Sequence, residues 1–300
     1  MDKKMLGIVG GVSAVLFAGA FLYFGNSGNT ININALPGAN NEARKEAQEI
    51  VRDIKAVRDE FELLRAPGES FADEVVELEQ MLAVEKYADI ISRGNLLKDE
   101  IAAHIEIQKN KPKFAITFDA GAGAGATERL AEYLGASRVK ITFFATGKWT
   151  EQNPALFDTI LEPTAELKNE LGNHTYSHPH FVSDNLSDET IREEIIKTEG
   201  IFADRGKTAK PLFRYPYGQR NPHTDELLAG LGYRPIGWSV DSLGWQNKLT
   251  ADEIVERVVS RAKSGGILLM HVGSDMDVDA IPKIVERLKN THQFVFISEL

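Results

Sequence analysis

The chain has 300 residues, of which 43% are hydrophobic and 26% charged, a globular composition that excludes a wholly disordered or an all-membrane protein. Its formal net charge of −10 at pH 7 argues against a nucleic-acid partner, because gripping phosphates requires a basic surface, whereas a neutral or cationic polymer remains compatible. There is no cysteine, so a protein-bound metal would have to rest on His, Asp or Glu.

The N-terminus carries a long apolar run. No charged residue occurs in Met5–Phe24, which matches the ~20 apolar residues that a membrane-spanning helix needs. Two lysines precede the run and the next charged residue is Glu42, so the positive-inside rule places the remainder of the chain outside the cell. We therefore expect a single-pass signal-anchor over residues 1–25 in the cell membrane. A cleavable signal peptide, giving a secreted protein, is the alternative, because Ala18–Ala20 resembles a cleavage site.

Two segments separate this run from the C-terminal part. Residues 26–41 are rich in Asn and Gly and read as a linker. In residues 42–110, apolar side chains recur at helical spacing on both sides of a break at Ala66–Gly68, with charges on the other faces. The pattern predicts a helical hairpin or coiled-coil stalk, which could also form a homo-oligomer.

Residues 111–300 show a different pattern, in which short β-rich runs alternate with helical stretches. This alternation predicts a parallel sheet built from βαβ units. Because the carboxyl ends of parallel strands meet at one edge, residues that follow them share a site. Five expected strand ends lead directly into ionisable residues: Asp119, His174, Arg214, Asp241 and His271.

Five short motifs contain these residues, and two of their imidazoles are spaced to chelate a metal. His174 and His178 would share a face if their segment were helical, which suits zinc or a similar ion. The ordered motifs resemble those of the polysaccharide deacetylase family, also called the NodB-homology domain or carbohydrate esterase family four. They are Thr117–Gly121, His174-x3-His178, Arg214–Gly218, Asp241–Trp245 and Leu269–His271.

The resemblance implies an α/β fold, a distorted (β/α) barrel, over residues 111–300. It implies metal-assisted hydrolysis of acetyl amides, or of acetyl esters, on a cell-envelope or extracellular polysaccharide such as peptidoglycan or an N-acetylglucosamine polymer. The metal ligands would be His174 and His178, and zinc, cobalt or nickel would suit them.

The resemblance also implies a role for each remaining motif residue. Asp119 would be the general base and Arg214 would keep it ionised. His271 would be the general acid, kept protonated and oriented by Asp241. Three further residues would bind the substrate, one by its backbone N–H at the oxyanion and two by lining an acetyl pocket: Tyr217, then Trp245 and Leu269.

The sequence departs from the family at three places. Ala120 stands where the family has an aspartate that binds the metal, so we expect a weakened metal site. Gly244 stands where an aspartate commonly precedes the tryptophan. The glycine-rich run Gly121–Ala126 lacks a phosphate-loop frame and would instead let the backbone pass close to the substrate or metal. Ala120 leaves open a second function, that of a non-catalytic carbohydrate-binding or scaffold protein.

Overall fold

A computed structural model describes residues 39–64, 70–84, 86–121 and 123–300. The expected signal-anchor over residues 1–25 and nearly all of the expected linker lie outside these ranges. Among the helices of the described ranges, none is long and apolar enough to cross a membrane.

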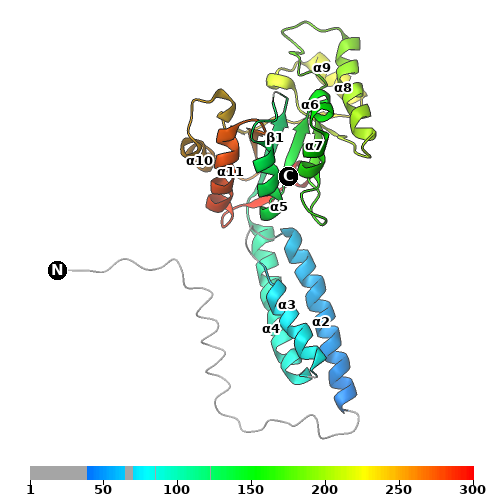
Figure 1. Cartoon of the computed structure of the whole chain (residues 1–300), viewed down its shortest axis with the longest axis vertical. Coiled ribbons are helices and arrows are strands. Elements are labelled where there is room, and N and C mark those ends of the chain that lie inside the picture. Colours follow the sequence, from blue (N-terminus) through cyan, green and yellow to red (C-terminus); the bar gives the residue numbers. More distant parts are fainter. Residues whose placement is uncertain (1–38, 65–69, 85, 122) are drawn as a thin grey trace, which may run out of the picture.

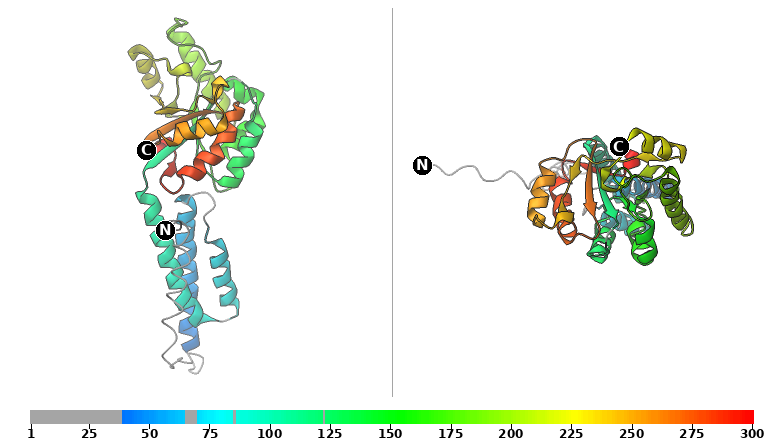
Figure 2. Two further views of the ribbon diagram at one scale, coloured as in Figure 1. Left: turned by 90° about the vertical axis from the view of Figure 1, so that its left-hand side faces the viewer. Right: turned by 90° about the horizontal axis from the view of Figure 1, so that it is seen from above.

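The stalk consists of three helices lying side by side, where the sequence predicted two helical stretches (Figures 1 and 2). They are α2 (Ala39–Leu64), α3 (Ala72–Ala83) and α4 (Tyr87–Asn110). The second stretch reverses because its apolar stripes are out of phase. Leu78 and Tyr87 are both buried but nine residues, about two and a half turns, apart, so one continuous helix would place them on opposite faces.

The apolar faces of the three helices form a core of their own. Helices α2 and α4 are in close contact at Gly94, where an added Cβ would lie only 2.4 Å from Cγ2 of Ile50. Small residues at such crossings allow two helix backbones to pack tightly.

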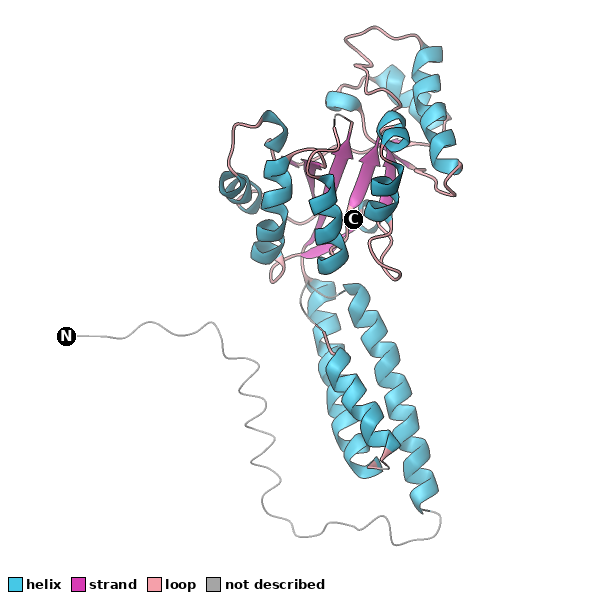
Figure 3. Cartoon of the chain, viewed as in Figure 1, coloured by secondary structure: helices cyan, strands magenta, loops and turns pink. Residues whose placement is uncertain are grey.

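The C-terminal part is an eight-stranded parallel sheet with the order β5-β4-β3-β2-β1-β7-β6, and β8 pairs with β1 (Figure 3). The two ends of the order, β5 and β6, are not paired with each other, so the sheet is a parallel half-barrel and not a closed barrel. The strands are β1 (Lys113–Ala120), β2 (Thr142–Ala145), β3 (Glu170–Asn173), β4 (Leu212–Phe213), β5 (Arg234–Pro235), β6 (Val240–Asp241), β7 (Gly266–His271) and β8 (Gln293–Val295).

The helices connect these strands, and those labelled α5, α7 and α11 in Figure 1 lie in front of the sheet. The α-helices are α5 (Thr127–Ser137), α6 (Gly147–Gln152), α7 (Pro154–Leu161), α8 (Asp188–Ala203), α9 (Pro222–Gly230), α10 (Ala251–Val259) and α11 (Asp275–Leu288). The 3₁₀ turns are η2 (Pro216–Gly218), η3 (Gly244–Gln246) and η4 (Ile297–Glu299).

Strand β1 has a different environment on each of its two faces. Successive side chains of a strand point to opposite faces. Phe118 and Ala120 belong to the large core that the helices cover. Thr117 and Asp119 alternate with them and point to the other face, where both contact Arg214. The strand therefore presents its carboxylate away from the helix-covered core.

The direction of β1 fixes where its polar end lies. The strand starts at Lys113, shortly after α4 ends at Asn110, so its amino end adjoins the stalk (Figure 1). Its carboxyl end, which carries Asp119, lies at the opposite edge of the sheet. The ionisable residues that follow the parallel strands accordingly gather on the side of the domain that faces away from the stalk.

Candidate active site

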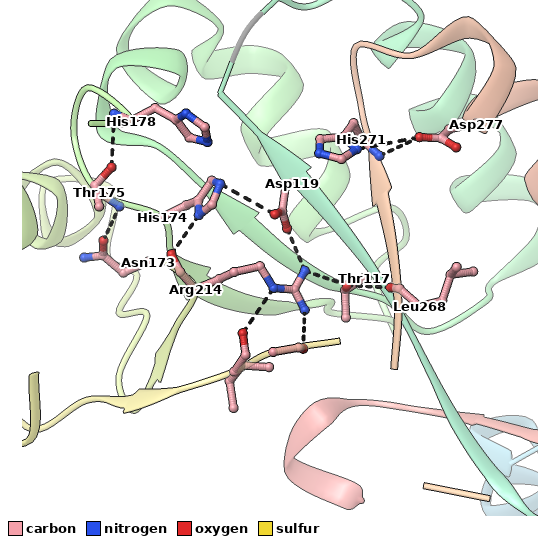
Figure 4. A network of polar contacts seen from close by, with 12 residues as sticks. Thr117, Asp119, Asn173, His174, Thr175, His178, Arg214, Leu268, His271 and Asp277 are labelled. Carbon is pink, nitrogen blue, oxygen red and sulfur yellow. Dashed lines mark hydrogen bonds and ion pairs between the residues drawn. The ribbon is translucent and has the colours of Figure 1, made fainter. Parts of the chain in front are cut away.

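The structure confirms the five expected strand ends. Strand β1 carries Asp119 next to its last residue, β6 ends at Asp241 and β7 ends at His271. His174 directly follows β3, and Arg214 directly follows β4. The register places Asp119 opposite His271 on the neighbouring strand. In Figure 4, Asp119 lies between His174 and His271.

Asp119 and Arg214 form a buried ion pair. Arg214 Nη1 donates to Asp119 Oδ1 at 2.7 Å, and the exposed fractions of the two residues are 0% and 5%. Burial raises the pKa of Asp119, but the positive charge and hydrogen bond of Arg214, together with the neighbouring His174 and His271, outweigh burial, and the net pKa of the carboxyl is lowered. The carboxylate is therefore ionised at neutral pH.

The position of the Arg214 guanidinium is fixed on several sides. Nη1 also donates to Thr117 Oγ1 at 2.7 Å, and Nη2 donates to the carbonyl of Gly237 at 3.2 Å. The guanidinium carbon lies 4.0 Å from the ring centroid of Phe144, a cation–π contact. Because the donors of Arg214 have several partners, the orientation of Asp119 is fixed as well.

His174 and His178 lie on a turn, not on a helix, yet their ring centroids are only 4.8 Å apart. The turn is possible because Thr175 and His178 adopt positive φ angles of 69° and 64°. The spacing of four residues thus brings the two imidazoles together by a route that helical periodicity does not predict.

His174 presents a lone pair to the site. Its Nδ1 donates to the carbonyl oxygen of Arg214 at 2.8 Å, so Nε2 of the neutral ring is an acceptor. Burial lowers the pKa of His174, which favours the neutral ring. Nε2 faces Asp119 Oδ2 at 3.5 Å. Two electron-pair donors that face each other in a buried site fit a bound cation.

His178 also favours its neutral, metal-binding form. Burial lowers the pKa of His178 to about 3. The described residues contain no cluster of three or more His, Asp or Glu that could hold a metal ion. Ala120 packs in the helix-side core and supplies no ligand. The two neutral imidazoles fit a metal ion, and the weakened site expected from Ala120 stays a prediction.

The structure corrects the expected partner of His271. We expected Asp241 to orient this ring, but the carboxylate of Asp241 accepts from the backbone N–H of Leu243 at 2.8 Å. The carboxylate beside His271 is that of Asp277, whose Oδ2 lies 3.8 Å from Nδ1 of the ring and 2.9 Å from the backbone nitrogen of His271.

The surrounding carboxylates favour the protonated form of His271. Burial lowers its pKa, but the nearby carboxylate of Asp277 and the negative charges of Asp119 and Asp241 outweigh burial, so the pKa is raised above 6.5. Sequence reasoning missed Asp277 because it lies in a helix and in none of the five motifs. Its one local signal is Ser274, whose Oγ accepts from the backbone N–H of Asp277 as an N-cap.

The three expected substrate-binding residues differ in exposure. Tyr217 is 55% exposed, has a positive φ of 58°, and stacks on His180 with ring centroids 3.6 Å apart. Trp245 is 53% exposed, whereas Leu269 is buried. The oxyanion contact of the Tyr217 backbone N–H and the acetyl pocket formed by Trp245 and Leu269 stay predictions.

The glycine-rich run is in close contact with the loop that follows β7. Gly125 has a φ of +33°, and an added Cβ there would lie 2.4 Å from the carbonyl oxygen of Gly273. The sequence predicted that the backbone of this run would pass close to the substrate or metal. In the structure, the run contacts the loop that begins directly after His271. At the start of the run, an added Cβ on Gly121 would lie 3.1 Å from the His178 ring.

Comparison with known proteins agrees with this geometry. Residues 106–236 match the family model described as polysaccharide deacetylase. Two peptidoglycan-N-acetylglucosamine deacetylases of Bacillus cereus are each 33% identical to the chain. In one the match covers 65% of this chain and 91% of the relative, and in the other 60% and 64%.

The chain belongs to the polysaccharide deacetylase family. Among solved structures, this deacetylase-family domain resembles a family 4 carbohydrate esterase from Streptomyces lividans with bound acetate, with a TM-score of 0.55 and 31% identity over 61% of this chain and 91% of that one. It also resembles a family 4 pseudoenzyme from Bacillus anthracis, with a TM-score of 0.57 and 28% identity over 64% of this chain and 66% of that one. This chain thus spans less than two thirds of the length of the second B. cereus relative.

Proposed function

We propose that the domain hydrolyses the acetyl amide of N-acetylated sugars in a cell-envelope polysaccharide, with peptidoglycan as the first substrate to test. O-acetyl groups are the alternative linkage. The observation that carries the proposal is the buried, ionised Asp119, which Arg214 holds in place opposite His271. A base and an acid at one strand edge are what amide hydrolysis requires.

The base and the acid would act at separate atoms. Asp119 takes a proton from the attacking water, and Arg214 keeps its carboxylate ionised before the reaction. His271 donates a proton to the leaving amine nitrogen, and its raised pKa favours the protonated ring that this step requires. The backbone N–H of Tyr217 would donate to the oxyanion that forms between these two steps.

The imidazoles of His174 and His178 would hold a divalent ion, and zinc, cobalt and nickel all accept such nitrogen ligands. When bound, this ion polarises the acetyl carbonyl and acidifies water. With two imidazoles and no carboxylate at Ala120, we expect weak binding, since catalytic zinc usually has three protein ligands. The neutral state of both rings, caused by burial, supports this assignment.

We further propose that the domain lies outside the cytoplasmic membrane and is anchored by residues 1–25. The uncharged run Met5–Phe24 supports the anchor, with cleavage and secretion as the alternative. The stalk would separate the site from the membrane surface. The three stalk helices bury their apolar stripes against one another, so we do not propose the homo-oligomer that the sequence allowed.

The second candidate is a non-catalytic carbohydrate-binding or scaffold protein. The specific observation in its favour is the buried methyl of Ala120, together with the similarity to the B. anthracis pseudoenzyme. The intact Asp119–Arg214 pair favours the enzyme.

Acetate release distinguishes the two functions. The full chain, purified in a mild detergent, would be assayed on peptidoglycan, N-acetylglucosamine polymers and acetylated xylan, with and without added zinc, cobalt or nickel. Release that disappears in Asp119→Asn supports the enzyme. Binding of any of these polymers without release, under all metal conditions, supports the second candidate.

A further inference from the structure

A carboxylate occupies the space that a side chain at position 244 would fill. An added Cβ on Gly244 would lie 2.2 Å from Oδ1 and 2.8 Å from Oδ2 of Asp277. Gly244 has no positive φ, so its backbone conformation does not require glycine. Position 244 has no side chain because the carboxylate of Asp277, which belongs to helix α11, fills this space.

Helix α11 and its cap hold Asp277 there. Ser274 Oγ accepts from the backbone N–H of Asp277 at 3.2 Å, which fixes the first turn of the helix. The side chain of Asp277 is completely buried, and its Oδ2 accepts from the backbone N–H of His271. A fully buried carboxylate without a cationic side chain in contact is costly unless a nearby group is protonated.

Each of these same two side chains also has a buried atom that lacks a partner. Within the part of the chain that the structure describes, Nδ1 of His271 and Oδ1 of Asp277 are buried and have no hydrogen-bond partner. Nδ1 lies 3.8 Å from Oδ2 of Asp277, so a small rotation of the ring would close a charge-assisted hydrogen bond.

We propose that Asp277 is the positioning residue of His271, and that its carboxylate orients the ring and keeps it protonated from the space left open by Gly244. The proposal rests on the proposed function only in so far as His271 acts as the acid. The sequence predicted that Asp241, in the motif that ends at Trp245, would orient His271. The proposal assigns this role to Asp277 in helix α11 instead.

The other charged groups near His271 are Asp119 on β1, Asp241 on β6, and His174 and His178 on the loop after β3. Asp119 is paired with Arg214, and the Asp241 carboxylate accepts from the backbone N–H of Leu243. The carboxylate that contacts the His271 ring is that of Asp277, whose Oδ2 lies 3.8 Å from Nδ1. Its removal should therefore affect His271 more than the removal of Asp241.

The test is a titration of the His271 ring by NMR in the full chain, with ring-labelled histidine and His271→Gln to assign the signal. Asp277→Asn keeps the shape and one acceptor oxygen but removes the charge. We expect the titration midpoint of His271 to fall by about one pH unit or more. The control is Asp275→Asn, which removes the same charge from an exposed position in the same helical turn. It should leave the midpoint unchanged.

Activity supplies a second measurement. A general acid must be protonated, so the rate falls as the pH rises through its pKa. Asp277→Asn should move this alkaline limb to lower pH, whereas a purely structural loss would lower the rate at every pH. The double variant Gly244→Asp/Asp277→Ala returns a carboxylate to the same space and should recover both the midpoint and the limb.

Failure of this proposal is distinguishable from failure of the proposed function. An unchanged His271 midpoint in Asp277→Asn, or a larger change in Asp241→Asn, overturns the assignment of Asp277. A lowered midpoint in a chain that releases no acetate on any substrate supports the pairing and overturns the enzyme instead. If Asp277→Asn fails to fold, Gly244→Ala, whose methyl would displace the carboxylate, makes the same prediction for the midpoint.

Discussion

Arg214 Nη1 lies 2.7 Å from both Asp119 Oδ1 and Thr117 Oγ1, which are two residues apart on one face of β1. One guanidinium nitrogen thus bridges two side chains of the same strand. This relationship ties the ionised carboxylate to the sheet rather than to a loop. The orientation of the Asp119 carboxylate is therefore fixed by contacts within the sheet.

Replacing Asp119 with Asn should remove the base and keep the shape. We expect acetate release to fall by about 10²- to 10⁴-fold, the usual contribution of a positioned base. The measurement is the rate of acetate release by the full chain on its best substrate. The matched control is Asp252→Asn, which should retain full activity. Asp252 is an exposed residue of α10 whose carboxylate pairs with Lys283 of α11. Retained activity in Asp119→Asn would rule out this residue as the base.

Replacing Arg214 with Ala should destabilise the fold. Asp119 would remain as a buried charge without its partner, which costs about 3–5 kcal/mol in free energy of unfolding. Urea unfolding followed by circular dichroism measures this cost. Arg220→Ala is the control, because its pair with Asp225 is half exposed and such pairs contribute only about 0–1 kcal/mol. Equal effects of the two variants would contradict a special role for the buried pair.

The sequence predicted the strand ends because each of them joins an apolar run to a charged residue. The convergence of Asp119, Arg214 and His271 follows from parallel topology alone. Contacts that depend on two elements distant in sequence were not predictable. Asp277 reaches His271 only because α11 packs against η3, and no periodicity indicates that packing. The turn at His178 depends on positive φ angles at Thr175 and His178, and these residue types do not predict such angles.

Metal binding should depend on His178. His178→Ala should abolish measurable zinc binding in isothermal titration calorimetry, since a single imidazole would remain at His174. Ala120→Asp should lower the stability of the metal-free chain, because Ala120 is buried among apolar side chains on the helix-covered face of β1. Zinc binding that is identical in the unchanged chain and in His178→Ala would place the metal elsewhere.

The stalk should be sensitive at Gly94 without affecting catalysis. Gly94→Val pushes a branched side chain into Ile50 and Ile54 across the α2–α4 contact, which should destabilise the stalk by about 1–3 kcal/mol. Ala103→Val, at an exposed position of the same helix, controls for the helix propensity of valine. Thermal unfolding measures the difference between the two variants. A loss of acetate release in Gly94→Val at a temperature where the domain is folded would show that the stalk does more than separate the site from its anchor.

Gly125→Ala should weaken catalysis through the loop that follows β7. The added methyl would collide with the carbonyl oxygen of Gly273, and a positive φ of +33° adds backbone strain of about 1–3 kcal/mol. Because this loop begins directly after His271, its displacement should move the acid and lower kcat more than it raises KM. The control is Gly230→Ala at the end of α9, where an added Cβ meets nothing within 4 Å and φ is not positive. That substitution should leave kcat unchanged and stabilise the helix by about 0.5–1 kcal/mol. Steady-state kinetics of the two variants, together with the NMR midpoint of His271, would locate the effect. A normal kcat in a folded Gly125→Ala variant would show that the two loops move independently of the acid.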